Sequence, residues 1–172
     1  MKSTPVSGVT LRRWRSSDID ELVRYANNRN IWLNLRDRFP HPYKRSDAEA
    51  WIALCDKETE PILQFAIDLD GEALGGIGFE RMLDVHRLTA EVGYWIAEPF
   101  WARGVASSAL ERATAYAFDS LGLERLQAIV FEGNAASMRV LEKNGFALEG
   151  RLKRYIFKDG RFLDGMLYAR LR

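Results

Sequence analysis

The segment from Trp101 to Ser107 places small residues where a helix is expected to begin. It follows an apolar, strand-like run and reads Trp-Ala-Arg-Gly-Val-Ala-Ser. The first amides of a helix lack intrahelical partners and carry the positive end of its dipole, so phosphate groups bind there. Gly104, Ala106 and Ser107 would allow a close approach, and Arg103 would add a charge. The segment predicts an anion-binding turn, with an ordinary strand-to-helix turn as the alternative.

A second polar turn lies near the C-terminal third, in the segment NAASMRVLEKNGFALEG. Asn134 is a typical N-cap for a short helix, and Asn144 with Gly145 would end it. Phe146 then enters another strand. The two segments therefore predict two helices that each begin next to a polar, exposed turn.

Other reactive side chains give weaker signals. Cys55 is the single cysteine and shares a helical face with apolar residues, which favours a buried core thiol in a reducing compartment. His41 and His86 lie far apart and show no metal-ligand spacing, so we expect no metal. The cluster from Gly75 to Gly78 lacks a third glycine of a nucleotide motif and indicates a bulge or a close packing point.

The hydrophobic periodicity predicts a mixed α/β sheet in one domain, residues 1–172, with the element order βααβββαβαββ. Ser46, with Glu49 three residues on, predicts a capping box for the second helix. Asp70-Gly71 predicts a tight hairpin. The expected strands are 9–14, 62–69, 73–80, 88–97, 126–131, 146–155 and 162–171, and the expected helices are 17–26, 46–55, 105–121 and 134–144.

Composition excludes several classes of protein. The net charge of +1 gives no global field for nucleic acid or an anionic membrane. No run of 18 apolar residues occurs, and the start of the chain is polar, so we expect a cytoplasmic protein. The basic clusters at residues 12–15 and 151–154 are interpreted as solvated strand faces, although a local anionic ligand stays open for them.

These motifs together resemble the GNAT superfamily of acyl-CoA-dependent N-acetyltransferases. The segment from Trp101 to Ala106 is similar to the family's Q/R-x-x-G-x-G/A loop, with Trp101 at the first position. The family pattern N-x-x-A/S followed by G-F is met by Asn134, Ser137 and Gly145-Phe146. Within the superfamily the chain resembles the Rim-type subgroup, which acetylates ribosomal-protein N-termini. The resemblance implies a sheet whose fourth and fifth strands splay apart.

The resemblance also implies how acetyl-CoA, as a co-substrate, would bind. Its diphosphate would lie on the amides of Arg103, Gly104, Val105, Ala106 and Ser107. The pantetheine arm would pair with the backbone near Trp95, Ile96 and Ala97, and Asn134 would hydrogen-bond the same arm.

Two residues are the catalytic candidates. Glu91 lies on the fourth strand, where it would accept the proton of the amine; a strand carboxylate paired with an arginine is the alternative. Many members carry a tyrosine seven residues after the asparagine, where this chain has Leu141. In Rim-type relatives a serine three residues after it is proposed to assist the leaving thiolate, and Ser137 occupies that position. A backbone amide of the fourth strand would stabilise the oxyanion.

The acceptor is expected to be a peptide or protein N-terminal α-amine. Deprotonating an α-amine at neutral pH costs about 1 kcal/mol, whereas a lysine-like amine costs ~4.6 kcal/mol. The alternatives are a polyamine or aminoglycoside acceptor, or a non-catalytic acyl-CoA-binding module. The cations between Asn27 and Arg45 argue against a polycationic acceptor.

Several aromatic side chains are candidates for the walls of the acceptor pocket, with core packing as the alternative. The candidates are Trp32, Phe39, Tyr43 and Trp51 on one side and Phe157, Phe162 and Tyr168 on the other. The second group could instead form a dimer interface, so either a monomer or a homodimer is expected.

Overall fold

The computed structural model describes residues 6–172, and the polar start of the chain, residues 1–5, lies outside them. The strands are β1 (Val9–Arg12), β2 (Gln64–Leu69), β3 (Glu72–Arg81), β4 (Thr89–Ile96), β5 (Arg125–Phe131), β6 (Ala147–Lys158) and β7 (Arg161–Leu171). The α-helices are α1 (Ile19–Ala26), α2 (Arg29–Trp32), α3 (Arg45–Asp56), α4 (Val105–Asp119) and α5 (Ala135–Lys143). None of the helices in residues 6–172 combines the length and apolar character needed to span a membrane.

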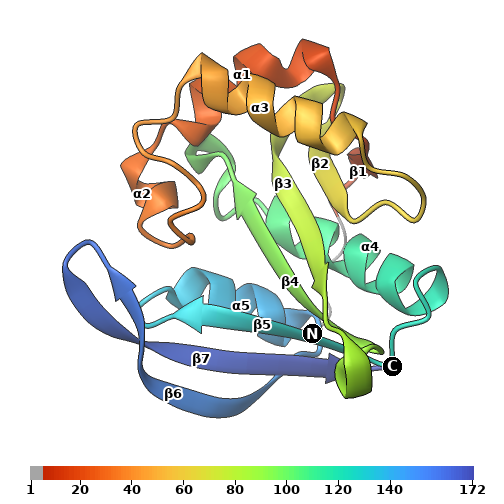
Figure 1. The fold of residues 1–172 in the computed structure, drawn as a ribbon, viewed down its shortest axis with the longest axis vertical. Helices are drawn as coiled ribbons and strands as arrows, with labels where there is room; N and C mark the ends of the chain where they lie inside the picture. Colours follow the sequence, from red (N-terminus) through yellow and green to blue (C-terminus); the bar gives the residue numbers. More distant parts are fainter. Residues whose placement is uncertain (1–5) are drawn as a thin grey trace.

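All of these strands form one sheet in the order β1-β2-β3-β4-β5-β7-β6 (Figure 1). Every neighbouring pair is antiparallel except β4 and β5, which are joined through α4 and run parallel. The predicted mixed sheet and its element order are therefore confirmed, with α2 as an addition.

The sheet opens between its two parallel strands. β4 pairs with β5 only from Thr89 to Glu91, and beyond that point β4 stays with β3 while β5 stays with β7. The two halves of the sheet diverge from there, which is visible as a V between β4 and β5 (Figure 1). The predicted splay is confirmed, and it leaves one edge of each strand without a partner strand.

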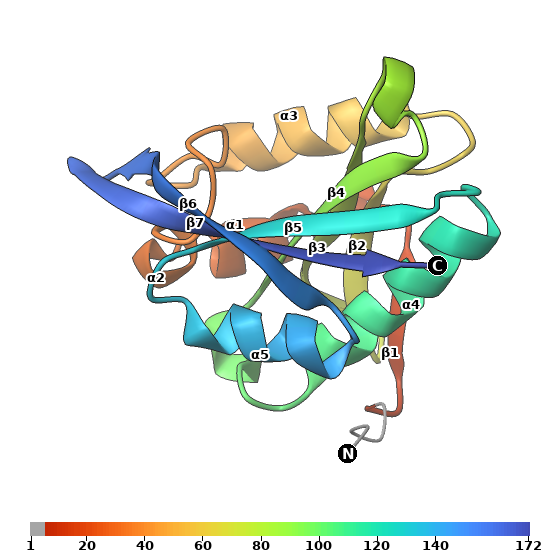
Figure 2. The same cartoon turned by 90° about the horizontal axis from the view of Figure 1, so that it is seen from below.

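Helices cover the two faces of the sheet separately. α4 and α5 lie on one face and α3 on the other (Figure 2). The core on the α4 side is built from small alanines of the helix against strand residues such as Ile77 and Leu126. A second core, around Trp14, Ala48 and Ile52, fixes α1 and α3 on the other face. Each face of the sheet is thereby covered by a core of its own.

Two local predictions need correction. The predicted loop after α1 contains the short helix α2, because the Asn28 side chain accepts hydrogen bonds from the amides of Asn30 and Ile31 at 2.8 and 3.4 Å. The capping box at Ser46 is wrong. Asp47 accepts from the Lys44 amide at 2.7 Å, so the N-cap is Lys44, two residues before Ser46, and Ser46 lies in the first turn of the helix.

The predicted hairpin and packing point are confirmed. Asp70 and Gly71 both have positive φ, 54° and 96°, as a two-residue hairpin loop requires. A Cβ on Gly75 would lie 2.1 Å from the Trp95 carbonyl oxygen, so only glycine fits there. The register shifts at the same place, between Ile67 and Asp68 on the neighbouring strand.

Candidate active site

The N-terminus of α4 lies at the open end of the V, and within residues 6–172 its first amides lack a hydrogen-bond partner. The first intrahelical hydrogen bond runs from the Ser108 amide to the Gly104 carbonyl at 3.0 Å. The amides of Val105, Ala106 and Ser107 therefore have no intrahelical partner, and Gly104, as the N-cap, has no side chain to accept from them. Gly104 has a φ of 82°, which lets the chain turn sharply into the helix.

The turn before α4 is tied to β4. The Trp101 indole nitrogen donates to the Ile96 carbonyl at 2.7 Å. Ala102 also has a positive φ, 59°, so successive backbone groups turn toward one side. Arg103 is exposed, and its guanidinium carbon lies 5.4 Å from the centre of the Phe100 ring. In the predicted segment 103–107, Arg103 and Gly104 are exposed, Val105 is buried, and Ala106 and Ser107 are half-buried. Binding of a diphosphate to the amides of this turn stays a prediction.

The register of β3 and β4 decides which backbone groups face the V. The Met82 amide bonds to the Thr89 carbonyl and the Ala97 amide to the Leu74 carbonyl, at 3.0 and 2.7 Å. Residues of β4 alternate, so Trp95 and Ala97 direct their backbone groups toward β3. Tyr94 and Ile96 direct theirs into the V. Of the three predicted backbone contacts, only Ile96 directs its backbone into the V, and since its carbonyl already accepts from Trp101, its amide is the group left facing the V. Tyr94 is a residue that the sequence reasoning missed.

Glu91 lies at the bottom of the V and borders a cavity of about 440 Å³. Its side chain is 19% exposed and forms an ion pair with Arg36. Arg36 also binds Glu80 at 2.6 Å, and this contact holds the pKa of Glu80 below its ordinary value. The cavity is lined by Leu35, Arg36, Asp37, Glu91, Ile129, Phe131, Tyr155, Ile156, Phe157 and Lys158. The contact with Arg36 is the carboxylate–arginine pair that the alternative interpretation of Glu91 expects. The cavity beside Glu91 nevertheless gives its carboxylate access to a ligand.

The opposite face of β4 carries the second candidate. The Tyr94 hydroxyl and the Ser137 hydroxyl are 2.9 Å apart, and the Ser137 amide donates to the Asn134 side chain at 3.1 Å. Burial raises the pKa of Tyr94 to about 12, although its hydrogen bond with Ser137 opposes the shift. The phenol is therefore neutral near pH 7. When the Tyr94 hydroxyl donates its hydrogen to the Ser137 oxygen, the Ser137 hydroxyl can donate its own hydrogen to a third group in the V.

Asn134 performs the capping role that its sequence context predicts. Its side-chain oxygen accepts from Ser137, while its side-chain nitrogen donates to no group of residues 6–172. Leu141, at the position where many relatives carry tyrosine, is fully buried. These positions leave Ser137 as the hydroxyl of α5 nearest to Tyr94.

The β6–β7 hairpin closes the far wall of the cavity. The Lys158 side chain is 2% exposed, and its ammonium lies 2.7 Å from Asp37 and 3.7 Å from the centre of the Trp32 ring. Arg29 and Asp159 form a further ion pair at 2.7 Å. The hairpin tip is thereby fixed to the loop that carries Arg36, which agrees with its position beside α2 (Figure 1).

Most aromatic candidates for the pocket belong to the core instead. Phe39, Tyr43 and Trp51 pack in the second core, and Tyr168 is buried with its hydroxyl donating to Glu142 at 3.0 Å. Of the residues predicted from the tail, only Phe157 lines the cavity. No cluster of three or more possible metal ligands occurs among residues 6–172.

A mixed sheet opened between parallel strands, with helix amides on one side of the opening and a carboxylate cavity on the other, defines an N-acyltransferase architecture. Residues 9–147 match the acetyltransferase (GNAT) domain family. The chain belongs to this family and is an N-acetyltransferase.

Two relatives match part of the chain. Over 98 residues, 57% of this chain and 55% of its relative, the chain is 41% identical to the uncharacterized N-acetyltransferase YoaA of Bacillus subtilis. Over 107 residues, 62% and 59%, it is 36% identical to the ribosomal-protein-serine acetyltransferase of Escherichia coli. Both alignments therefore span little more than half of the relative.

A solved structure aligns over nearly the whole chain. The spermidine N-acetyltransferase from Vibrio cholerae, in complex with CoA and spermine, has a TM-score of 0.79 and 26% identity over 96% of each chain. The relatives thus include acetyltransferases for proteins and for small amines.

Proposed function

We propose that the chain transfers the acetyl group of acetyl-CoA to the α-amine at the N-terminus of a peptide or protein. The observation that carries this proposal is the arrangement around β4. Glu91 faces a cavity on one side of the strand, and Ser137 with Tyr94 lies on the other. An amine and a thioester that enter from opposite sides would therefore meet in the V.

Acetyl-CoA would supply an activated acetyl thioester. The amides of residues 103–107 would hold its diphosphate, and the backbone of Tyr94 with the amide of Ile96 would pair with the pantetheine arm. The side-chain nitrogen of Asn134, which has no partner within residues 6–172, would donate to the same arm. The complex of the Vibrio cholerae relative with CoA supports this choice of co-substrate.

Glu91 would take the proton that leaves the acceptor amine, and Ser137 would donate a hydrogen bond to the departing sulfur. A carboxylate already paired with Arg36 must release that cation before it can accept a proton. Such a carboxylate is a sufficient base for an α-amine, whose deprotonation costs about 1 kcal/mol. It is less suited to a lysine-like amine, whose deprotonation costs ~4.6 kcal/mol. This difference favours the peptide acceptor.

A polyamine is the second candidate, and the spermine complex of the Vibrio cholerae relative favours it. The charges around the cavity oppose it, because Glu91 and Asp37 are matched by Arg36 and Lys158. A site for a polycation would carry an excess of carboxylates.

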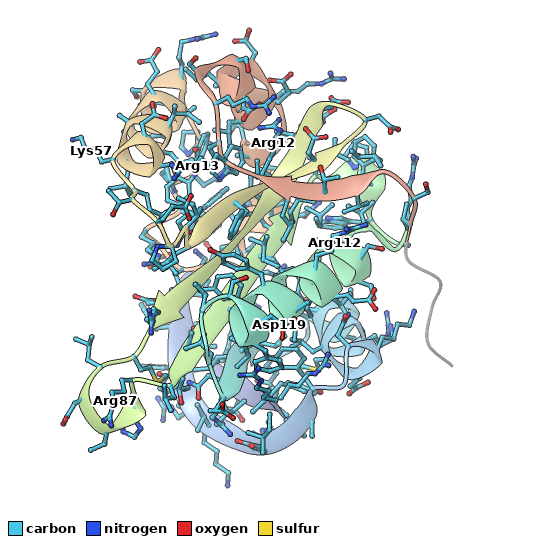
Figure 3. All side chains as sticks on the ribbon, turned by 90° about the vertical axis from the view of Figure 1, so that its right-hand side faces the viewer. Arg12, Arg13, Lys57, Arg87, Arg112 and Asp119 are labelled. Atoms are coloured by element: carbon cyan, nitrogen blue, oxygen red, sulfur yellow. The ribbon has the colours of Figure 1, made fainter. Side chains whose placement is uncertain are left out.

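The test is release of free thiol from acetyl-CoA with three acceptors: a peptide, the same peptide with a blocked N-terminus, and spermidine. We expect release with the free peptide alone, and a loss of kcat in Glu91→Gln. Asp119→Asn, on the exposed end of α4 (Figure 3), is the matched control and should change nothing. Release with spermidine alone would replace the peptide proposal, and coenzyme binding without release would indicate a binding module.

A further inference from the structure

The tip of the β6–β7 hairpin exposes three large aromatic side chains. Tyr155 and Phe157 are each 60% exposed and Phe162 is 55% exposed. The rings of Phe157 and Phe162 lie 5.0 Å apart, and the Arg154 guanidinium lies 4.4 Å from the centre of the Phe162 ring. Aromatic rings gathered on a surface in this way are typical of an interaction site.

The charges on the hairpin are unevenly matched. Its carboxylates are neutralised, Asp159 by Arg29 and Asp164 by Arg151. Lys153, Arg154 and Arg161 are exposed and make no ion pair within residues 6–172. The surface therefore combines aromatic rings with three cations that lack an internal partner. Phe162 is the register partner of Phe157 and Arg161 that of Lys158, so Arg161 lies on the other side of the two-stranded tip from the two phenylalanine rings. We name the exposed group that wraps the tip the hairpin face: Lys153, Arg154, Tyr155, Phe157, Arg161 and Phe162.

The hairpin face is continuous with the cavity. Tyr155 and Phe157 belong to both, and Glu91 borders the same cavity. Lys158, buried between the two surfaces, fixes their relation through Asp37. An acceptor whose amine reaches Glu91 and whose chain continues past the cavity wall would pass over the hairpin face.

We infer that the hairpin face binds the acceptor beyond its amine, and that the segment bound there is an acidic peptide with apolar side chains among its carboxylates. The inference rests on the proposed peptide acceptor and specifies its sequence class. The cations would pair with carboxylates and the rings would cover apolar side chains. A polyamine would be repelled by the same three cations.

The experiment compares acceptor peptides that share their first two residues and differ in the next four, which are acidic, uncharged or basic. With the wild-type enzyme, kcat/KM should be highest for the acidic peptide and should fall as salt is raised. Exposed ion pairs contribute little individually, so the combined substitution of Lys153, Arg154 and Arg161 by glutamate should lower kcat/KM for the acidic peptide by about tenfold. The same variant should raise it for the basic peptide.

The matched control is Arg87→Glu. Arg87 is an exposed arginine on the turn between β3 and β4 (Figure 3), at the end of the sheet where β5 begins, whereas the hairpin tip lies beyond the end of β5. It should leave all the peptides unaffected, and the KM for acetyl-CoA should be unchanged in both variants.

The outcomes separate the inference from the proposed function. If no peptide is acetylated, the proposed function fails and takes the inference with it. If the wild-type enzyme acetylates all the peptides with the same kcat/KM, and the triple variant gives the wild-type value for each, the inference alone is overturned. It is also overturned if ultracentrifugation shows that the wild-type protein is a dimer and the triple variant a monomer, because a second copy would then cover the hairpin face. Binding of single-stranded RNA through the same cations, without a preference among the peptides, would likewise refute it.

Discussion

Tyr94→Phe tests whether the phenol positions Ser137 for its proposed role. The substitution removes one hydroxyl from a side chain that otherwise keeps its shape. Because the lost contact is a 2.9 Å hydrogen bond between neutral groups, it is worth roughly 0.5–1.5 kcal/mol, or a fall in kcat of about 2- to 12-fold. Ser137→Ala would remove a hydrogen bond to a developing thiolate, roughly 1.5–3 kcal/mol, or about 10- to 150-fold in kcat.

The informative measurement is the double-mutant cycle, with thiol release followed at saturating acetyl-CoA and peptide. If Tyr94 acts through Ser137, Tyr94→Phe should change kcat by less than about twofold in the Ser137→Ala background. The dissociation constant for CoA should stay close to the wild-type value in all three variants. The pKa of Tyr94 is raised to about 12, so the wild-type to Tyr94→Phe ratio should be constant between about pH 7 and pH 9. Fully additive effects would refute the positioning role.

Three further outcomes are expected. Arg103→Glu should raise the KM for acetyl-CoA by about tenfold at low salt and leave kcat unchanged, whereas Arg87→Glu should change neither. Asp37→Ala leaves the buried Lys158 without its carboxylate partner, so the free energy of unfolding in urea should fall by ~1–2 kcal/mol. This figure is discounted because Asp37 itself is exposed. Equal stability would mean that Trp32 suffices as the partner of Lys158. Burial raises the pKa of Cys55 to about 12, so the folded state binds the thiol proton more tightly than the unfolded chain does. The free energy of unfolding should therefore fall as the pH rises from about 9 to 12. At pH 8 the thiol should react with a thiol reagent only after unfolding.

Local sequence signals predicted most of the fold. The Asp70-Gly71 turn and the Asn134 cap are written in a few adjacent residues, and both occur where expected. The failures are also local. α2 has only four residues, too few for a hydrophobic period to show, and the start of α3 was decided by Asp47 reaching back to Lys44 rather than by the serine.

The site was less accessible to sequence reasoning because its contacts join distant residues. Arg36 and Glu91 are 55 positions apart, and Tyr94 and Ser137 are 43 apart, so no spacing rule connects them. Strand alternation alone could have placed Glu91 and Tyr94 on opposite faces of β4. The resemblance of the 101–106 loop to a known family supplied the coenzyme, whose binding here stays a prediction.

Arg36 explains how a base in this cavity could distinguish amines. It bridges Glu80 and Glu91, so the Glu91 carboxylate is already neutralised before any acceptor arrives. An incoming ammonium must replace Arg36 at Glu91, and Arg36 can retain Glu80 when it does. The exchange of one cation for another gains little Coulomb energy, so the charge of the acceptor contributes little to its affinity. On the proposed mechanism, selectivity would then come from the cost of deprotonation and from contacts beyond the amine, and both would favour an α-amine on a peptide whose following residues reach the hairpin face.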